Sequence, residues 1–293
     1  MRSRRLSCTL LALTLGGTLT AQSLQPSLSV TLSRVDNISR TSDVATRRDA
    51  TTYEATLAAS HHRQLTRAWS VTTGGELSTF QEPDFDRNAF TTLAGRLAFQ
   101  RKAGLGPLAP VVSIESALAY QDTRYASHRG MTVESGLRIS KRITPSLRTS
   151  AGVQWREHFA RTQTFDTHQR SASLEATWDF AERWSLAGSL RTVEGRFLTH
   201  AGPAAWARAL GGSLGPAVAR VYASIPSEVT GLYGPNWITY RPKAHATTGS
   251  ASLLFAFTDR ASAELQGSLT SMTNEADVHY PTQALSLRLG YRF

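Results

Sequence analysis

The sequence predicts an all-β fold, namely a closed antiparallel up-and-down transmembrane β-barrel of about twelve strands. Segments of about ten residues alternate apolar and polar side chains, and polar breaks separate them. This is the pattern of strands that face lipid on one side only. Beyond the first 21 residues no stretch reaches about 18 apolar residues, so the sequence offers no candidate for a membrane-spanning helix.

Residues 1–21 have the features of a secretory signal peptide. Three arginines precede an apolar run over residues 6–19, and Ala21 ends the small and polar residues that follow. A basic start, a short apolar run and a small final residue are typical of a cleaved signal. A retained transmembrane anchor is the alternative, but the run is short for one. We therefore expect residues 22–293 to form one barrel domain.

Charge and cysteine content agree with export. The only cysteine, Cys8, lies in the expected signal peptide, so the mature chain would carry no thiol through an oxidising periplasm. The formal net charge of +10 includes three signal arginines, which leaves +7 from Gln22 onward. For an exported chain we expect outer-membrane lipid and lipopolysaccharide as anionic partners, and no nucleic acid.

Twelve segments carry the alternation, each with its apolar residues on one face. In chain order they span residues 28–32, 53–59, 69–77, 93–99, 112–120, 131–139, 147–155, 172–180, 184–190, 251–257, 263–269 and 285–293. An even number is what single-chain bacterial barrels require.

The last segment carries a further signal. Leu285, Leu287, Leu289, Tyr291 and Phe293 share one face, and the chain ends on an aromatic residue of that face. The segment resembles the closing strand of bacterial outer-membrane β-barrel proteins, with Leu287, Leu289, Tyr291 and Phe293 as the assembly signal. The resemblance implies recognition by the outer-membrane assembly machinery, residence in the cell outer membrane and a periplasmic C-terminus. It identifies no subfamily beyond a porin-like barrel.

Connection lengths support that topology. Short connections are expected at residues 143–146, 181–183 and 258–260, and longer ones at 36–48, 81–88, 121–129 and 274–280. Outer-membrane barrels have short periplasmic turns and longer extracellular loops. A periplasmic C-terminus places every one of these connections on the expected side, and the long turn 102–110 is the exception.

Residues 193–245 break the rhythm and form a predicted extracellular loop. The stretch is rich in Gly, Ala and Pro. Short helices are expected over residues 203–210 and 216–223, because each begins at a proline. Such a loop folds into the lumen as a constriction, caps the mouth, contacts a partner, or stays a mobile surface loop, and the sequence leaves these four alternatives open.

Aromatic residues gather near the ends of the predicted strands on the apolar face, which favours a membrane girdle over a soluble β-sandwich. The girdle residues are Tyr53, Trp69, Tyr120, Trp155, Trp178 and Trp184.

The opposite face is expected to line the lumen with a balanced charge network. Its charged members are Glu54, Glu76, Arg96, Glu115, Glu134, Arg138, Arg148, Arg156, Glu175, Asp179, Arg191, Glu264, Arg288 and Arg292. Cross-strand pairs are expected between Arg96 and Glu115, Arg148 and Glu175, Glu175 and Arg191, and Glu264 and Arg288. The network either stiffens a partly plugged wall or orients a polar solute. Twelve strands lie between the packed eight-stranded and the open sixteen-stranded barrels.

No residue pattern predicts catalysis. His61 and His62 are expected in a periplasmic turn, and His158 and His168 flank an outer loop without an acidic or serine partner. The chain has no nucleophile-elbow, zinc-protease or phosphate-loop motif. We therefore expect no enzyme, no catalytic residue, no metal site and no cofactor.

The sequence thus predicts a narrow porin-like channel for small polar solutes. A non-conducting structural or adhesin-like barrel that acts through its extracellular loops is the alternative. The sequence does not indicate an oligomeric state.

Overall fold

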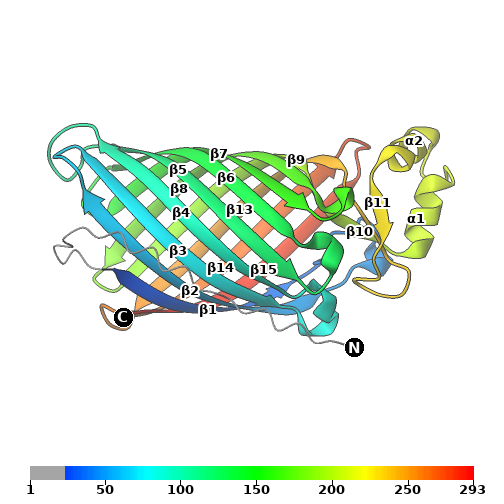
Figure 1. The fold of residues 1–293 in the computed structure, drawn as a ribbon, viewed down its shortest axis with the longest axis horizontal. Coiled ribbons are helices and arrows are strands. Elements are labelled where there is room, and N and C mark those ends of the chain that lie inside the picture. Colours follow the sequence, from blue (N-terminus) through cyan, green and yellow to red (C-terminus); the bar gives the residue numbers. More distant parts are fainter. Residues whose placement is uncertain (1–23) are drawn as a thin grey trace, which may run out of the picture.

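The computed structural model describes residues 24–293, so the expected signal peptide lies outside the described residues. Twelve long antiparallel strands close into a barrel (Figure 1). The strands are β1 (Gln25–Val35), β2 (Ala50–Gln64), β3 (Trp69–Gln81), β4 (Phe90–Lys102), β5 (Val111–Thr123), β6 (Gly130–Arg142), β7 (Leu147–Ala160), β8 (Thr167–Ala181), β9 (Trp184–Arg196), β13 (Lys243–Ala256), β14 (Ala261–Asn274) and β15 (His279–Arg292). The predicted fold class and strand number are confirmed. No helix among residues 24–293 is long and apolar enough to cross a membrane.

Every barrel strand pairs with its neighbours in chain order, and the first strand pairs with the last. Leu28 lies opposite Tyr291, and Leu32 opposite Leu287. This pairing satisfies the backbone groups of both terminal strands and leaves no open sheet edge. The terminal segment 285–293 therefore closes the barrel.

The outer wall of the barrel is apolar and accessible. Leu93, Leu269 and Phe293 are each more than 60% exposed, as expected for side chains that lipid covers in a membrane. The six predicted girdle residues are on this wall, with exposed fractions between 38% and 50%. The four residues of the expected assembly signal are exposed there too.

The two ends of the barrel differ. One end carries the C-terminus and the connections 65–68, 103–110, 143–146, 182–183 and 257–260; we call it the short-turn end. His61 and His62 were expected in a turn here, but they lie within β2 because that strand continues to Gln64. His62 faces the lumen, and its Nδ1 lies 3.0 Å from Thr72 Oγ1.

The other end carries the long loops and a small folded unit, residues 197–242, which we call the cap (Figure 1). Short 3-10 turns shape four of the loops: η1 (Val44–Thr46), η2 (Pro83–Asn88), η3 (Ala126–His128) and η4 (Gln163–Phe165). The cap contains β10 (Thr199–Ala201), α1 (Pro203–Leu210), α2 (Pro216–Ser224), β11 (Ser227–Val229) and β12 (Ile238–Tyr240).

Both helices of the cap begin at the predicted prolines. The three-stranded sheet β10–β12–β11 was not predicted. The cap is shorter than the expected loop 193–245, because β9 extends to Arg196 and β13 begins at Lys243. The structure therefore folds this loop into an ordered unit at the cap end.

Candidate functional site

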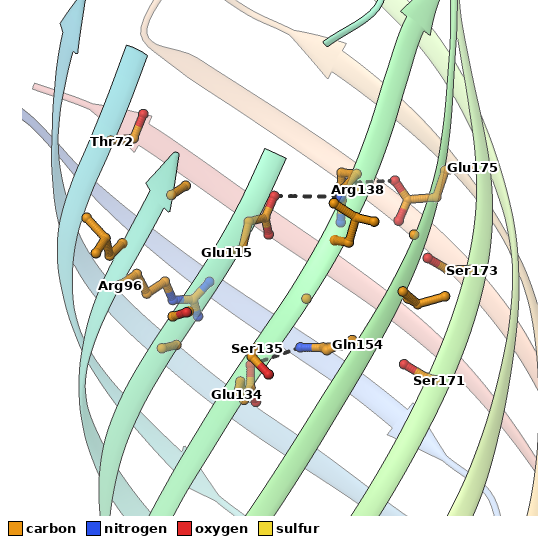
Figure 2. Close-up of a pocket in the computed structure, with 18 of the residues that line it drawn as sticks. Thr72, Arg96, Glu115, Glu134, Ser135, Arg138, Gln154, Ser171, Ser173 and Glu175 are labelled. Carbon is orange, nitrogen blue, oxygen red and sulfur yellow. Dashed lines mark hydrogen bonds and ion pairs between the residues drawn. The ribbon is translucent and has the colours of Figure 1, made fainter. Parts of the chain in front are cut away.

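The lumen holds a cavity of about 530 Å³ against the wall formed by β2 to β9 (Figure 2). Its lining alternates charged side chains with very small ones, because successive inward positions on these strands carry Glu or Arg next to Gly, Ala or Ser. The small residues leave the space that the long charged side chains cross.

Arg138 is the centre of one network on this wall. Its Nη1 lies 3.2 Å from Glu175 Oε2, and its Nε lies 3.9 Å from Glu115 Oε1. Glu175 is two strands away, but the residue opposite Arg138 on the intervening strand β7 is Gly152. Since Gly152 has no side chain, the guanidinium reaches across it. Ser150 Oγ donates a second hydrogen bond to Glu175, at 3.0 Å.

Glu134 is the centre of a second network. Its carboxylate lies 3.2 Å from Arg156 Nε and accepts a 3.0 Å hydrogen bond from Gln154 Nε2. Arg191 Nη2 donates to Gln154 Oε1 at 2.9 Å and to Ser171 Oγ at 3.0 Å. Side chains of strands β6 to β9 are thereby joined in one network, in which charged and neutral groups alternate.

None of the four predicted charge pairs forms an ion pair within the described residues. Arg96 pairs with Glu76 on β3, at 2.9 Å, instead of Glu115. Among the described ion pairs, Glu175 pairs with Arg138 and not with the predicted Arg148 or Arg191. Strand order alone does not predict these partners, because the stagger of neighbouring strands and the long reach of arginine decide them.

Glu264 and Arg288 are direct neighbours across β14 and β15, as expected. No ion pair within 4.0 Å forms between them in the described chain, because Arg288 Nη2 turns to Ser29 Oγ on β1, 3.3 Å away. Asp179 accepts a hydrogen bond from Ser185 Oγ at 2.6 Å. Glu54, Arg148 and Arg292, the remaining predicted lumen residues, share the inward parity and have no ion pair within the described residues.

The neutral members of these networks were not predicted. Gln154, Ser150 and Ser171 share the inward parity of their strands, so the same alternation could have identified them. Strand β13 carries no charged residue at its inward positions, and hydroxyl groups join it to both neighbours. Ser189 and Ser250 are 2.8 Å apart there, and Thr248 and Thr270 are 2.9 Å apart.

The lumen wall becomes apolar on one side of the cap end. Ala244, Ala246, Met272 and Tyr280 are all buried there and pack against Phe197 at the start of the cap. We call these five residues the collar. It lies on one side of the barrel, where β13, β14 and β15 meet the cap.

The cap contacts all five other loops at its end of the barrel. Glu228 on β11 accepts hydrogen bonds from Tyr125 Oη, Ser127 Oγ at 2.9 Å and Thr162 Oγ1 at 3.1 Å. These donors belong to two different loops. One carboxylate therefore clasps the β5–β6 and β7–β8 loops to the cap.

Further contacts complete the ring. Tyr233 stacks edge-on against Phe85 of the β3–β4 loop, with ring centroids 4.9 Å apart. Arg208 pairs with Asp43 of the β1–β2 loop. The hydroxyl of Tyr222 lies 3.0 Å from that of Tyr280, on the strand that follows the β14–β15 loop.

Burial within the cap end suppresses ionisation. Burial and the hydrogen bond to Glu228 raise the pKa of Tyr125 to about 12. Burial lowers the pKa of His128 to about 4 and that of His200 to about 3, so both are neutral at pH 7. Burial raises the pKa of the Glu82 carboxyl to about 7, against the opposing effect of a hydrogen bond from Asn88.

His158 and His168 do not form a catalytic arrangement. His168 lies 2.7 Å from Glu157, an acidic partner that the sequence analysis did not find because it follows from the β7–β8 register. His158 contacts Thr132 Oγ1 at 2.9 Å. Among residues 24–293 no group of three His, Cys, Asp or Glu side chains is placed to hold a metal ion.

Comparison with known proteins gives likeness of structure only. No family model matches the chain, and no curated protein matches it. The chain is similar to an outer-membrane channel from Pseudomonas putida F1, with 11% identity and a TM-score of 0.59, over 92% of this chain and 96% of that one. It is also similar to the NanC porin, with 9% identity and a TM-score of 0.49, over 91% of this chain and all of that one. The first likeness shows that the chain has the fold of an outer-membrane β-barrel.

Proposed function

We propose that this protein is a narrow porin-like channel for small polar solutes in the outer membrane. The cavity of about 530 Å³ inside the barrel carries the proposal. It is lined by charged and hydroxyl side chains, whereas the outer wall is apolar. A barrel that only filled its interior for stability would have no need of a polar cavity of this size.

On this proposal the short-turn end faces the periplasm and the cap end faces the exterior. The terminal strand would be read by the assembly machinery, and the outer wall would meet lipid and lipopolysaccharide. The charge networks around Arg138 and Glu134 would hold the lumen open with a hydrated, nearly neutral wall.

Planar-bilayer recording of refolded protein tests the channel. We expect discrete conductance steps. The variant Ser173→Trp places a large side chain in the cavity and should reduce the step size severalfold. Ala172→Trp, the adjacent residue on the lipid-facing side, is the matched control and should leave the step size unchanged.

Silence at high protein load would overturn the proposal, provided that gel migration is heat-modifiable and so shows a folded barrel. That outcome would favour the non-conducting surface barrel. Equal conductance in the wild type and the Ser173→Trp variant would show that the current does not pass through this lumen.

A further inference from the structure

The excess positive charge of the barrel lies at its short-turn end. Residues 24–293 carry a formal net charge of +7. Within three residues of a short turn or of the C-terminus there are ten basic and three acidic residues, a net charge of +7. The rest of the described chain, including the lumen networks and the cap end, is therefore neutral overall.

These ten cations have no carboxylate partner within 4.0 Å among the described residues. Every ion pair of residues 24–293 joins side chains of the lumen or the cap end, such as Arg138 with Glu175 or Arg124 with Asp86. The positive charge at the short-turn end is consequently not neutralised locally.

Strand alternation sorts seven of these cations into two sets. Lys102, Arg142, Arg148 and Arg292 share the inward parity of β4, β6, β7 and β15, so they surround the mouth of the lumen. Within three residues of the short turns, Asp179 is the acidic residue at an inward position, and Ser185 already donates to it.

Three further cations, Arg63, Arg101 and Lys141, share the outward parity. Arg101 lies over the ring of Trp69, 5.5 Å from its centroid, which places it on the outer wall. The remaining three, Arg67, Arg183 and Arg260, lie in the turns themselves.

A pocket of about 220 Å³ lies inside this mouth, beside β15. Arg260, Arg288 and Arg292 line it, with Glu264 as its one carboxylate. Ser29 and other serines of β1 and β14 supply hydroxyl groups around the same space. Three guanidinium groups against one carboxylate leave unsatisfied N–H donors, and guanidinium matches carboxylate and phosphate in shape and charge.

We propose that the short-turn mouth is an anion-binding vestibule, which selects small carboxylate- or phosphate-bearing solutes. The inference rests on the proposed channel function and names its solute class. A ring of like charges in a concave site raises the local concentration of counter-ions. The nearly neutral lumen beyond it would pass them without holding them tightly, because Arg96, Arg138 and Arg156 are already paired with carboxylates.

Two matched triple variants test the vestibule. The inward variant is Lys102→Gln, Arg142→Gln and Arg292→Gln. The outward variant is Arg63→Gln, Arg101→Gln and Lys141→Gln, which removes the same charge from the lipid-facing side of the same end. The readouts are the reversal potential in a potassium chloride gradient and the binding of inorganic phosphate to the detergent-solubilised protein.

The wild type should prefer chloride to potassium. At 0.1 M salt the chloride-to-potassium permeability ratio of the inward variant should be about threefold lower than that of the wild type. Salt at 1 M should reduce the preference of the wild type as well, since the screening length falls from about 10 Å to about 3 Å. Phosphate affinity should fall in the inward variant and stay unchanged in the outward one.

The outcomes separate the two proposals. A folded barrel without conductance overturns the channel, while the phosphate measurement still decides whether the vestibule binds anions. Conductance without anion preference, together with no phosphate binding, overturns the vestibule alone. If the outward variant loses phosphate binding to the same extent, the anion site is the lipid-facing rim, where a lipid headgroup would bind, and the vestibule is overturned.

Discussion

The cap end and the short-turn end of this barrel use charge in opposite ways. At the cap end arginines pair with carboxylates of neighbouring loops, as Arg124 does with Asp86 at 3.2 Å and as Arg208 of the cap does with Asp43. At the short-turn end the ten cations have no such partner in the described chain. Charge at the cap end therefore holds loops together, whereas charge at the short-turn end is not neutralised within the described residues, as the proposed vestibule requires.

The two ends also differ in how deeply their side chains are buried. The cap end contains most of the buried side chains of residues 24–293, including Phe165, Tyr240 and Tyr280. The short-turn end consists of tight turns whose side chains are mostly exposed. An ordered unit with its own core can close a mouth, whereas a ring of exposed arginines can only change what enters it.

Removing the cap should change the single-channel conductance more than any other variant, because it removes the difference between a covered and an open mouth. Phe197 N donates to Pro242 O at 3.1 Å, so β9 and β13 still run side by side where the cap leaves them. Replacing residues 198–241 with an Asn-Gly turn should therefore complete a hairpin. We expect the single-channel conductance to rise severalfold, because the cap no longer covers the lumen.

The control for this experiment is to show that the shortened barrel folds. Its thermal stability in detergent is measured by heat-modifiable gel migration. A folded, shortened barrel with the conductance of the full chain would show that the cap does not restrict the current.

Loosening the cap without removing it should have a smaller effect. Glu228→Ala removes the acceptor shared by Tyr125, Ser127 and Thr162. Hydrogen bonds to a charged group each contribute about 1.5–3 kcal/mol, so the cap should detach more often. Bilayer recordings should show more frequent openings to the conductance of the cap-free barrel.

Glu275→Ala, which removes an exposed carboxylate from the β14–β15 loop, is the matched control. Equal opening frequencies in the two variants would contradict the clasp assigned to Glu228.

Much of the barrel could be predicted because its strands obey one rule along their whole length. Lipid on one side and water on the other impose a period of two, and each of the twelve segments shows it without reference to its neighbours. The resemblance of the terminal strand to a closing strand also predicted which end of the barrel faces the periplasm. Proline marked the start of both cap helices for a local reason as well, since its fixed backbone angle suits the first helical turn.

The missed features depend on contacts between distant segments. Strands β10, β11 and β12 have three residues each, which is too short for any period, and five loops hold the cap in place. Likewise the partner of Arg138 depends on the stagger of three strands and on the absence of a side chain at Gly152. The parity of a charged residue can be read from the sequence, but its partner cannot.

The neutral lumen between the two ends can be tested by breaking its central network. Arg138→Gln leaves Glu115 and Glu175 without their arginine. We expect the reversal potential to shift toward cation preference, by less than the inward vestibule variant shifts it, because one charge is removed instead of three. Arg124→Gln removes one charge from the cap end and should leave the reversal potential unchanged. A shift of equal size in both variants would refute a special role for the lumen network.

The smallest expected effect concerns Glu82, which is 2% exposed beneath the cap. Burial raises the pKa of this carboxyl from 4.5 to about 7, and the nearby Asp84 adds to the increase. Between these pH values the folded chain keeps a proton that the unfolded chain has lost. Stability should therefore fall as the pH rises from about 4.5 to 7 and then level off.

Glu82→Gln, which mimics the protonated form, should melt at a higher temperature than the wild type at pH 8 and at the same temperature at pH 4. Asp84→Asn at the exposed neighbouring position should change the melting temperature less. If the melting temperatures of the wild type and Glu82→Gln changed in parallel with pH, this carboxyl would already be ionised in the folded cap end. Its burial would then not distinguish the cap end from the solvated short-turn end.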